Sequence, residues 1–394
     1  MHSMLGRFRA VEVDQIYAYE LLHRFVLSLI GIFIPIYIAT NGMQINWVFN
    51  YILIATAAFA AACIPASYVI ANIGFKHSLI ASYFFYMPAF LALRTYSLSP
   101  TLVVAAAIAY GFGNAFHWIS LHAEFATDTE QEGRGSASGK LIGLPKISQT
   151  IAPLAGGAIM AAFGFHALVS TSIGILILSA IPLFASKDHR DPLEYDLKSL
   201  FDSEHRKFAG LFLLRGADIA AAAILFPLFV FYIVGGEVSA GGAKSIASLG
   251  SIVFALTIGR ITGRFGKKKL MASGLLLASI FYISRAFVQT ATQAFAVSFF
   301  AGLFFMMYYV PLYSIYADVA EDEDILEFYA FREFFLNIGK LVTYGIATFF
   351  VLNYSVRTGF MAAFVYATVA TVGIVGYVSW IEEEDEERKR EDVD

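Results

Sequence analysis

Charged residues are scarce in this sequence. Only 15% of its 394 residues are Asp, Glu, Lys or Arg, whereas 58% are hydrophobic; an average soluble domain carries about 25% charge. This shortage excludes a soluble globular protein. No polar stretch exceeds the ~20 residues of one spanning helix, so no large soluble domain interrupts the chain. The sequence therefore indicates a polytopic protein of the lipid bilayer, with no nucleic-acid partner.

Several signatures of chemistry are also missing. Cysteine occurs once, at Cys63, which excludes an intrachain disulfide. No glycine-rich loop ends in Lys-Ser or Lys-Thr, so there is no sign of nucleotide hydrolysis. The sequence contains neither a metal-ligand cluster nor a nucleophile motif. We therefore expect no metal, no cofactor and no enzymatic activity.

The chain does contain a series of long apolar runs. Each is near the ~20 residues that cross a ~30 Å hydrocarbon core, and each must be helical because hydrocarbon offers no partner for open backbone groups. The first runs past signal-peptide length without a cleavage site, so we expect it to be retained. The fifth and sixth merge around residues 164–166. The twelve predicted spans are 16–41, 46–73, 78–97, 100–124, 139–164, 166–186, 207–234, 243–264, 269–289, 293–317, 329–353 and 358–380.

Positive charge lies almost entirely on one side of these spans. The opposite side holds only Lys244 and Arg357, with Arg94 at a helix end. By the positive-inside rule, both termini are therefore cytoplasmic. The expected fold is an all-α membrane protein with twelve transmembrane helices. Its predicted units are an N-terminal bundle (1–186), a cytoplasmic amphipathic linker (187–206), a C-terminal bundle (207–380) and a charged cytoplasmic tail (381–394).

The two predicted bundles repeat one another. Corresponding features recur in the same order, 191 to 194 residues apart. The repeat is parallel, because each unit contains an even number of spans. The matched pairs are Arg24 and Arg215, Pro35 and Pro227, Gly74 and Gly266, Arg94 and Arg285, Glu124 and Asp318, and Lys146 and Lys340.

A basic turn lies between the predicted eighth and ninth spans. Its spacing Gly-x-x-x-Gly-Arg-x-Gly-Lys-Lys resembles the signature turn of the major facilitator superfamily of transporters, except that Gly263 replaces the usual Asp. A stretch in the fifth span is similar to the family's Gly-x-x-x-Gly-Pro-x-x-Gly-Gly. The matching residues are Gly259, Gly263, Arg264, Gly266, Lys267 and Lys268 in the turn, and Ser148, Ala152, Pro153, Gly156 and Gly157 in the fifth span.

The resemblance implies two pseudo-symmetric six-helix bundles that rock around a midplane cavity. It implies a small-molecule substrate, possible coupling to H+ or Na+, and a monomer. The fourth span lacks the intramembrane Arg typical of proton-coupled drug exporters, which weakens that assignment. Length and short external loops indicate a prokaryotic plasma membrane. The alternatives are a member of the fold that acts as a sensor or scaffold without transporting and, with less support, an intramembrane enzyme.

Ionisable residues within spans usually face a cavity or a partner. Each half places an Arg in its first span with an acid about one turn away, Glu20 for Arg24 and Asp218 for Arg215. Family members line their cavity with helices one, four, seven and ten, so these arginines are candidates to bind an anionic or zwitterionic substrate. The alternative is a structural ion pair in each half. The full set of cavity candidates is Arg24, Asn114, His117, Arg215, Asp218, Tyr309 and Tyr313.

The other candidates have equally plain alternatives. His117 is either a substrate or proton contact or a packing histidine, and His122, five residues on, points elsewhere. The tyrosines either stack on a substrate or pack between helices. Near the outer ends, Arg94 and Arg285 are expected to snorkel to the headgroups.

One acid and one lysine recur 22 residues apart in both halves. We predict an inner gate in which Glu124 pairs with Lys340, and Asp318 with Lys146, across the two bundles. The alternative is pairing within each half, Glu124 with Lys146 and Asp318 with Lys340.

Overall fold

The computed structural model describes residues 2–95, 97–128, 134–185, 188, 203–265, 267–322 and 324–391, and this part of the chain contains helices and no strand. Its first half comprises α1 (His2–Ile30), α2 (Phe33–Thr40), α3 (Ile45–Ile73), α4 (Phe75–Ala81), α5 (Tyr83–Leu93), α6 (Pro100–Asp128), α7 (Arg134–Ser179) and a 3-10 turn (Ile181–Ala185). The second half comprises α8 (Ser203–Ala220), a π-helical turn (Ala221–Leu225), α9 (Phe226–Ile233), α10 (Glu237–Phe265), α11 (Lys267–Ser284), a 3-10 turn (Arg285–Phe287), α12 (Ala291–Asp322), α13 (Ile325–Asn353) and α14 (Val356–Glu391).

Ten helical segments of the described chain are long and apolar enough to cross a membrane. This number differs from the predicted twelve for two reasons. The segment Lys140–Phe184 counts once although it is 45 residues long, and it turns at Gly164, whose φ of +78° favours glycine. Helices α4 and α5 have only 7 and 11 residues and are separated at Ser82, so neither reaches span length alone.

The first span of each predicted half is interrupted near its matched proline. Helix α1 gives way to α2 just before Pro35, and α8 passes through the π-helical turn into α9 just before Pro227. Proline has no backbone N–H, and its ring crowds the preceding turn, so such a break is expected at this point. The two breaks occupy corresponding positions of the sequence repeat.

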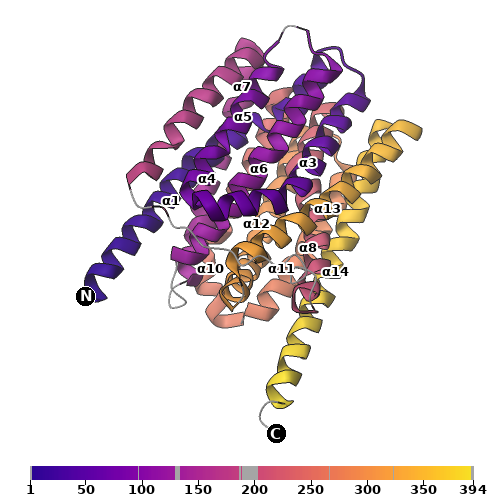
Figure 1. Cartoon of the computed structure of the whole chain (residues 1–394). Coiled ribbons are helices and arrows are strands. Elements are labelled where there is room, and N and C mark those ends of the chain that lie inside the picture. Colours follow the sequence, from indigo (N-terminus) through magenta and orange to yellow (C-terminus); the bar gives the residue numbers. More distant parts are fainter. Residues whose placement is uncertain are drawn as a thin grey trace.

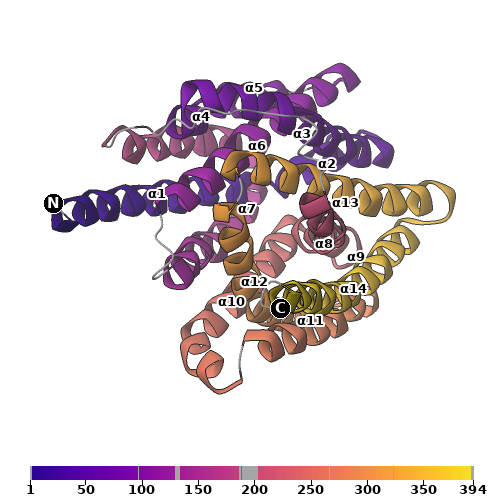
Figure 2. The ribbon, with the colours of Figure 1, turned by 60° about the horizontal axis from the view of Figure 1, so that its bottom comes forward.

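The long helices run together as one bundle, with both chain termini at its lower end in Figure 1. Viewed from that end, α3 to α6 lie on one side and α10 to α12 with α14 on the other (Figure 2). The two sides meet where α7 packs along α10 and where α3 packs along α13. The N- and C-terminal halves of the chain therefore share two long helix interfaces.

Small residues allow these helices to approach closely, as expected where helices associate in lipid. A Cβ at Gly302 of α12 would lie 1.8 Å from the carbonyl oxygen of Ala247 on α10. The glycines of the fifth-span motif allow the same close approach on two sides of α7. A Cβ at Gly156 would lie 2.1 Å from the carbonyl oxygen of Leu29 on α1, and one at Gly157 would lie 2.8 Å from that of Glu237 on α10.

The other motif residues are placed as follows. The Ser148 hydroxyl donates to the carbonyl oxygen of Leu21 at 2.8 Å, and Ala152 is fully buried. A Cβ at Gly241 would lie 2.3 Å from the carbonyl oxygen of Pro153. The helix-five motif therefore joins α7 both to α1 and, across the halves, to α10. The side chains of the basic turn 259–268 and most of the linker 187–206 lie outside the described part of the chain.

Candidate substrate cavity

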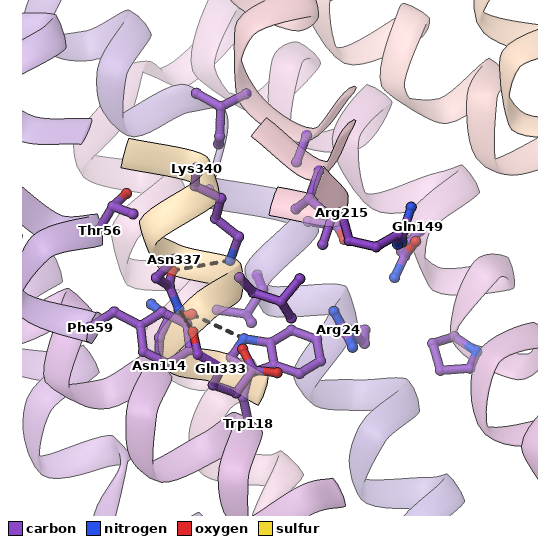
Figure 3. A pocket seen from close by; sticks show the side chains of 18 of the residues that line it. Arg24, Thr56, Phe59, Asn114, Trp118, Gln149, Arg215, Glu333, Asn337 and Lys340 are labelled. Carbon is purple, nitrogen blue, oxygen red and sulfur yellow. Dashed lines mark hydrogen bonds between the residues drawn. The ribbon is translucent and has the colours of Figure 1, made fainter. Parts of the chain in front are cut away.

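A cavity of about 400 Å³ lies between the two halves of the chain. Its wall is built by α1 to α3, α6 and α7 from the first half and by α8, the π-helical turn, α10, α12 and α13 from the second. The volume is typical of a site for one small molecule. In Figure 3, Asn114, Trp118, Glu333 and Asn337 are grouped together below Lys340, and Arg24 lies between this group and Gln149.

The wall of the cavity is strongly cationic. It carries six basic side chains but only two carboxylates, those of Glu20 and Glu333. The six basic residues are Arg24, Lys146, Arg215, Lys244, Arg332 and Lys340. A low-dielectric pocket with this excess of positive charge favours an anionic occupant.

Each of the three arginines has a carboxylate partner. Arg24 donates from Nε to Glu20, four residues earlier on α1, and its guanidinium lies 3.8 Å from the ring centroid of Trp118. Arg332 donates to the carboxylate of Glu333 at 2.9 Å. These charges are therefore balanced within the protein.

The pair of Arg215 and Asp218 has a third member. Arg215 is 2% exposed and donates to Asp218 one turn later on α8. The hydroxyl of Tyr308 on α12 donates to the same carboxylate at 2.6 Å and accepts from Arg215 at 2.8 Å. This network ties α8 to α12 inside the second half.

The three lysines differ from the arginines. Lys146 donates to the amide oxygen of Gln149 at 3.0 Å, Lys340 to that of Asn337 at 3.2 Å, and Lys244 to the carbonyl oxygen of Ala223 at 3.0 Å. Within the described part of the chain, none of the three ammonium groups lies within 4.0 Å of a carboxylate. The amino groups of these three lysines, from α7, α10 and α13, are therefore held only by neutral oxygens at the cavity wall.

Two comparisons identify the family. Residues 208–394 match the family model of the Major Facilitator Superfamily. The fold matches a crystal structure of the E. coli fucose:proton symporter FucP with a TM-score of 0.66, over 94% of this chain and 99% of that one. Residues 208–394 thus resemble the major facilitator superfamily in sequence, and the whole chain shares the fold of a transporter. It is thus a multi-pass membrane transporter. The sequence matches no curated protein, and at 13% identity the likeness to FucP shows a shared fold.

Five of the seven cavity residues predicted for this transporter lie on the cavity wall. They are Arg24, Asn114, Arg215, Tyr309 and Tyr313. Asp218 instead lines a smaller chamber next to the cavity. The arginines are held in the ion pairs that the sequence offered as the alternative, so their position on the wall does not make them free to bind a ligand.

His117 is buried behind the wall. Its Nδ1 is 2.9 Å from the hydroxyl of Tyr19, its Nε2 is 3.7 Å from Glu20, and its ring stacks on His23 with centroids 3.9 Å apart. These contacts fit the packing role. The prediction that His122 points elsewhere was incomplete, because His122 does line the cavity and its Nδ1 lies 2.7 Å from the hydroxyl of Tyr313 on α12.

Within the described part of the chain, Glu124 does not pair with Lys340, its predicted partner across the bundles. Glu124 is buried and pairs with Lys76 of α4 at 3.1 Å, a partner in its own half that neither version of the gate included. Lys146 and Lys340 line the cavity instead, and the side chain of Asp318 lies outside the described part of the chain. The cross-bundle gate stays a prediction for another conformation of the transporter.

Sequence reasoning missed several wall residues. Lys244 was counted with the charges on the outer side of the membrane, although it lies about two turns inside the span Glu237–Ala255. Arg332 and Glu333, near the start of the predicted eleventh span, were not among the predicted cavity residues. A lysine within an apolar window was the available signal, since such residues usually face a cavity.

Proposed function

We propose that this transporter moves a small organic anion across the plasma membrane by alternating access of two six-helix bundles. The three cavity lysines without a carboxylate partner carry this proposal. An unpaired charge facing a low-dielectric cavity is expensive, and an anionic ligand would offset that cost for all three at once. Paired arginines alone would leave no net charge for a ligand to neutralise.

Twelve crossings account for the helices. The 45 residues of Lys140–Phe184 are more than twice the ~20 that one crossing needs, so they supply two. Helices α4 and α5 together supply one more crossing, and each of the nine other candidate segments supplies one. An even count places both termini on one side, as drawn in Figure 1, and the positive-inside rule makes that side cytoplasmic.

The cavity also bears on the alternative of a sensor or scaffold that does not transport. Such a protein needs no polar opening between its halves, whereas a transporter does. A cavity of about 400 Å³ with charged walls on both sides of the interface supports transport. The walls carry no arrangement that we would assign to an enzyme. We expect the transporter to function as a monomer.

Coupling to a cation would help an anion to enter a cell. Moving one negative charge against the membrane potential costs about 2.3 kcal/mol per 100 mV. We propose a proton as the coupling ion, with Glu20 as its carrier, because this carboxylate lines the cavity and has Oε2 without a hydrogen-bond partner. An imposed pH gradient across sodium-free proteoliposomes should drive uptake by the wild type but not by Glu20→Gln. Uptake that depends on sodium would contradict proton coupling.

The substrate class is tested by ligand-dependent thermal stability of the purified transporter. We expect organic anions to raise the unfolding temperature, and sugars, neutral amino acids and cationic drugs to have no effect. Hits are then followed as flux into proteoliposomes. Stabilisation by neutral or cationic solutes, with none from anions, would refute the proposal. Binding of an anion without flux would favour the sensor.

A further inference from the structure

A second, smaller chamber of about 170 Å³ adjoins the main cavity. It is walled mainly by the second half of the chain, through α8 to α12 and the π-helical turn. The side chains of Lys146, Gln149 and Lys244 border both spaces. A group bound in the main cavity and a group bound in the chamber would therefore share these neighbours.

Arg285 is the notable residue of this chamber. The sequence predicted that it snorkels to the headgroups, as for its repeat counterpart Arg94, which is exposed. Instead Arg285 is 3% exposed and lines the chamber, with its guanidinium 4.3 Å from the ring centroid of Tyr282 and 5.0 Å from that of Phe226. Its Nε and Nη1 have no hydrogen-bond partner. A buried guanidinium with unused donors is costly unless a ligand accepts from them.

The rest of the chamber also suits an anion. The hydroxyl of Ser298 lines it and has no hydrogen-bond partner. One carboxylate is present, that of Asp218, and it is engaged by Arg215 and Tyr308. The remaining charges on the wall are the cations of Lys146, Lys244 and Arg285. Arginine can present two parallel donors to a carboxylate or phosphate group.

We propose that the chamber is a second anion subsite, in which Arg285 and Ser298 hold an acidic group. This inference rests on the proposed anion transport and extends it. The acidic group is either the second acid of a dianionic solute, whose first acid lies in the main cavity near Lys340, or a free inorganic anion bound beside a monoanionic solute. Both share the same chemistry at Arg285.

The test compares three probes on the purified transporter in non-ionic detergent. Succinate and butyrate share a four-carbon skeleton but carry two and one acidic groups, and inorganic phosphate represents a free anion. Dissociation constants come from thermal-shift titrations of the wild type, Arg285→Gln, Arg285→Lys and Lys340→Gln. In the wild type we expect either succinate to bind about tenfold more tightly than butyrate, or phosphate to tighten butyrate binding by about tenfold. Tighter binding of succinate would show that the chamber holds the solute's own second acid. Tighter binding of butyrate in the presence of phosphate would show that the chamber holds a free anion.

The variants separate the two sites. Arg285→Gln should abolish the preference for succinate over butyrate, or the effect of phosphate on butyrate, whichever the wild type shows. It should leave the affinity for butyrate without phosphate unchanged. Arg285→Lys should keep part of the wild-type preference or effect. Lys340→Gln should weaken butyrate and succinate alike. An unchanged preference in Arg285→Gln, or an equal loss for all probes, overturns the subsite while the main cavity stands. An unaffected Lys340→Gln removes Lys340 from the main site and leaves the subsite standing.

A variant that does not fold and a wild type that binds no probe are also decisive. If Arg285→Gln fails to fold, Ser298→Ala replaces it and should lower the preference without changing the affinity for butyrate; an unchanged preference then refutes the subsite. A wild type that binds none of the three probes refutes both the subsite and the anion cavity.

Discussion

Substitution of Lys340 by Gln is the sharpest test of the anion cavity. The ammonium group of Lys340 faces the cavity from α13, is 3.2 Å from the amide oxygen of Asn337 and lies 5.3 Å from the ring centroid of Phe59 (Figure 3). It has no carboxylate partner in the described part of the chain. Glutamine keeps much of the length and a donor but removes the charge, so the change acts mainly on the ligand.

The expected effect follows from simple electrostatics. Two unit charges 4 Å apart at an effective dielectric constant of 20 interact by about 4 kcal/mol. Desolvation of the ammonium group and of the anion offsets part of this gain. A net hydrogen bond to a charged group contributes about 1.5–3 kcal/mol. We therefore expect Lys340→Gln to weaken binding of the anionic solute by roughly 10- to 150-fold.

The assay is a titration of the purified variant with the anion found in the stability screen. Lys140→Gln is the matched control, because Lys140 is exposed on α7 and lies outside the cavity wall. The control should bind as the wild type does. The reasoning is refuted if Lys340→Gln, Lys146→Gln and Lys244→Gln all fold normally and all retain the wild-type affinity.

Three further predictions concern stability and are measured as thermal or denaturant unfolding in detergent. Gly302→Ala places a methyl group against a carbonyl of α10 and should destabilise by about 1–3 kcal/mol, whereas Gly345→Ala, with open space around it, should be neutral. Asp218→Asn leaves Arg215 buried without a counter-charge and should cost about 3–5 kcal/mol; the double variant with Arg215→Gln should regain most of it, and additive losses would contradict the pairing. Tyr313→Phe removes a cross-half hydrogen bond and should cost about 1–3 kcal/mol; unchanged stability would show that the bond contributes nothing.

The sequence alone predicted the helices and the family well. Span positions depend on the local run of apolar residues, which a linear pattern records directly. The turn at Gly164 falls where the fifth and sixth apolar runs merge in the sequence, whereas the breaks near Pro35 and Pro227 lie inside spans that were predicted to be continuous. The basic turn at 259–269 and the helix-five motif indicated the same superfamily that the comparisons show.

The direction of side chains was harder to predict. Lys244 and Arg285 lie near the outer ends of their spans, where a lysine or arginine commonly reaches for the headgroups. Depth along a helix can be read from sequence, whereas the direction of a side chain around the helix depends on which helices pack beside it. Here α12 and α8 enclose these residues on the protein side. Tertiary packing therefore turned two expected surface charges into cavity residues.

The gate prediction failed to find the partner of Glu124 for a related reason. Spacing along the chain fixed its repeat counterpart but not its neighbour in space. Its partner, Lys76, follows the turn between α3 and α4, a segment far from Glu124 in sequence. The sequence matched Gly74 of this turn with Gly266 of the basic turn and gave the turn no pairing role. The repeated acid and lysine thus indicated that the halves correspond to one another. The ion pair of Glu124 with Lys76 is set by helix packing, which the spacing does not record.

The contrast between arginine and lysine in the cavity suits a transporter. A guanidinium forms several fixed hydrogen bonds and stays charged, which suits permanent networks such as Arg215 with Asp218 and Tyr308. An ammonium group is compact and strongly hydrated, and its flexible stem lets it follow a ligand. A carrier must release what it binds on the other side of the membrane. Three lysines held only by neutral oxygens can exchange a ligand for water or for those oxygens, whereas breaking the buried pair of Arg215 and Asp218 would leave a charge stranded in the bundle. If the proposed anion transport holds, Arg215 would keep the second half in shape and the lysines would carry the anion.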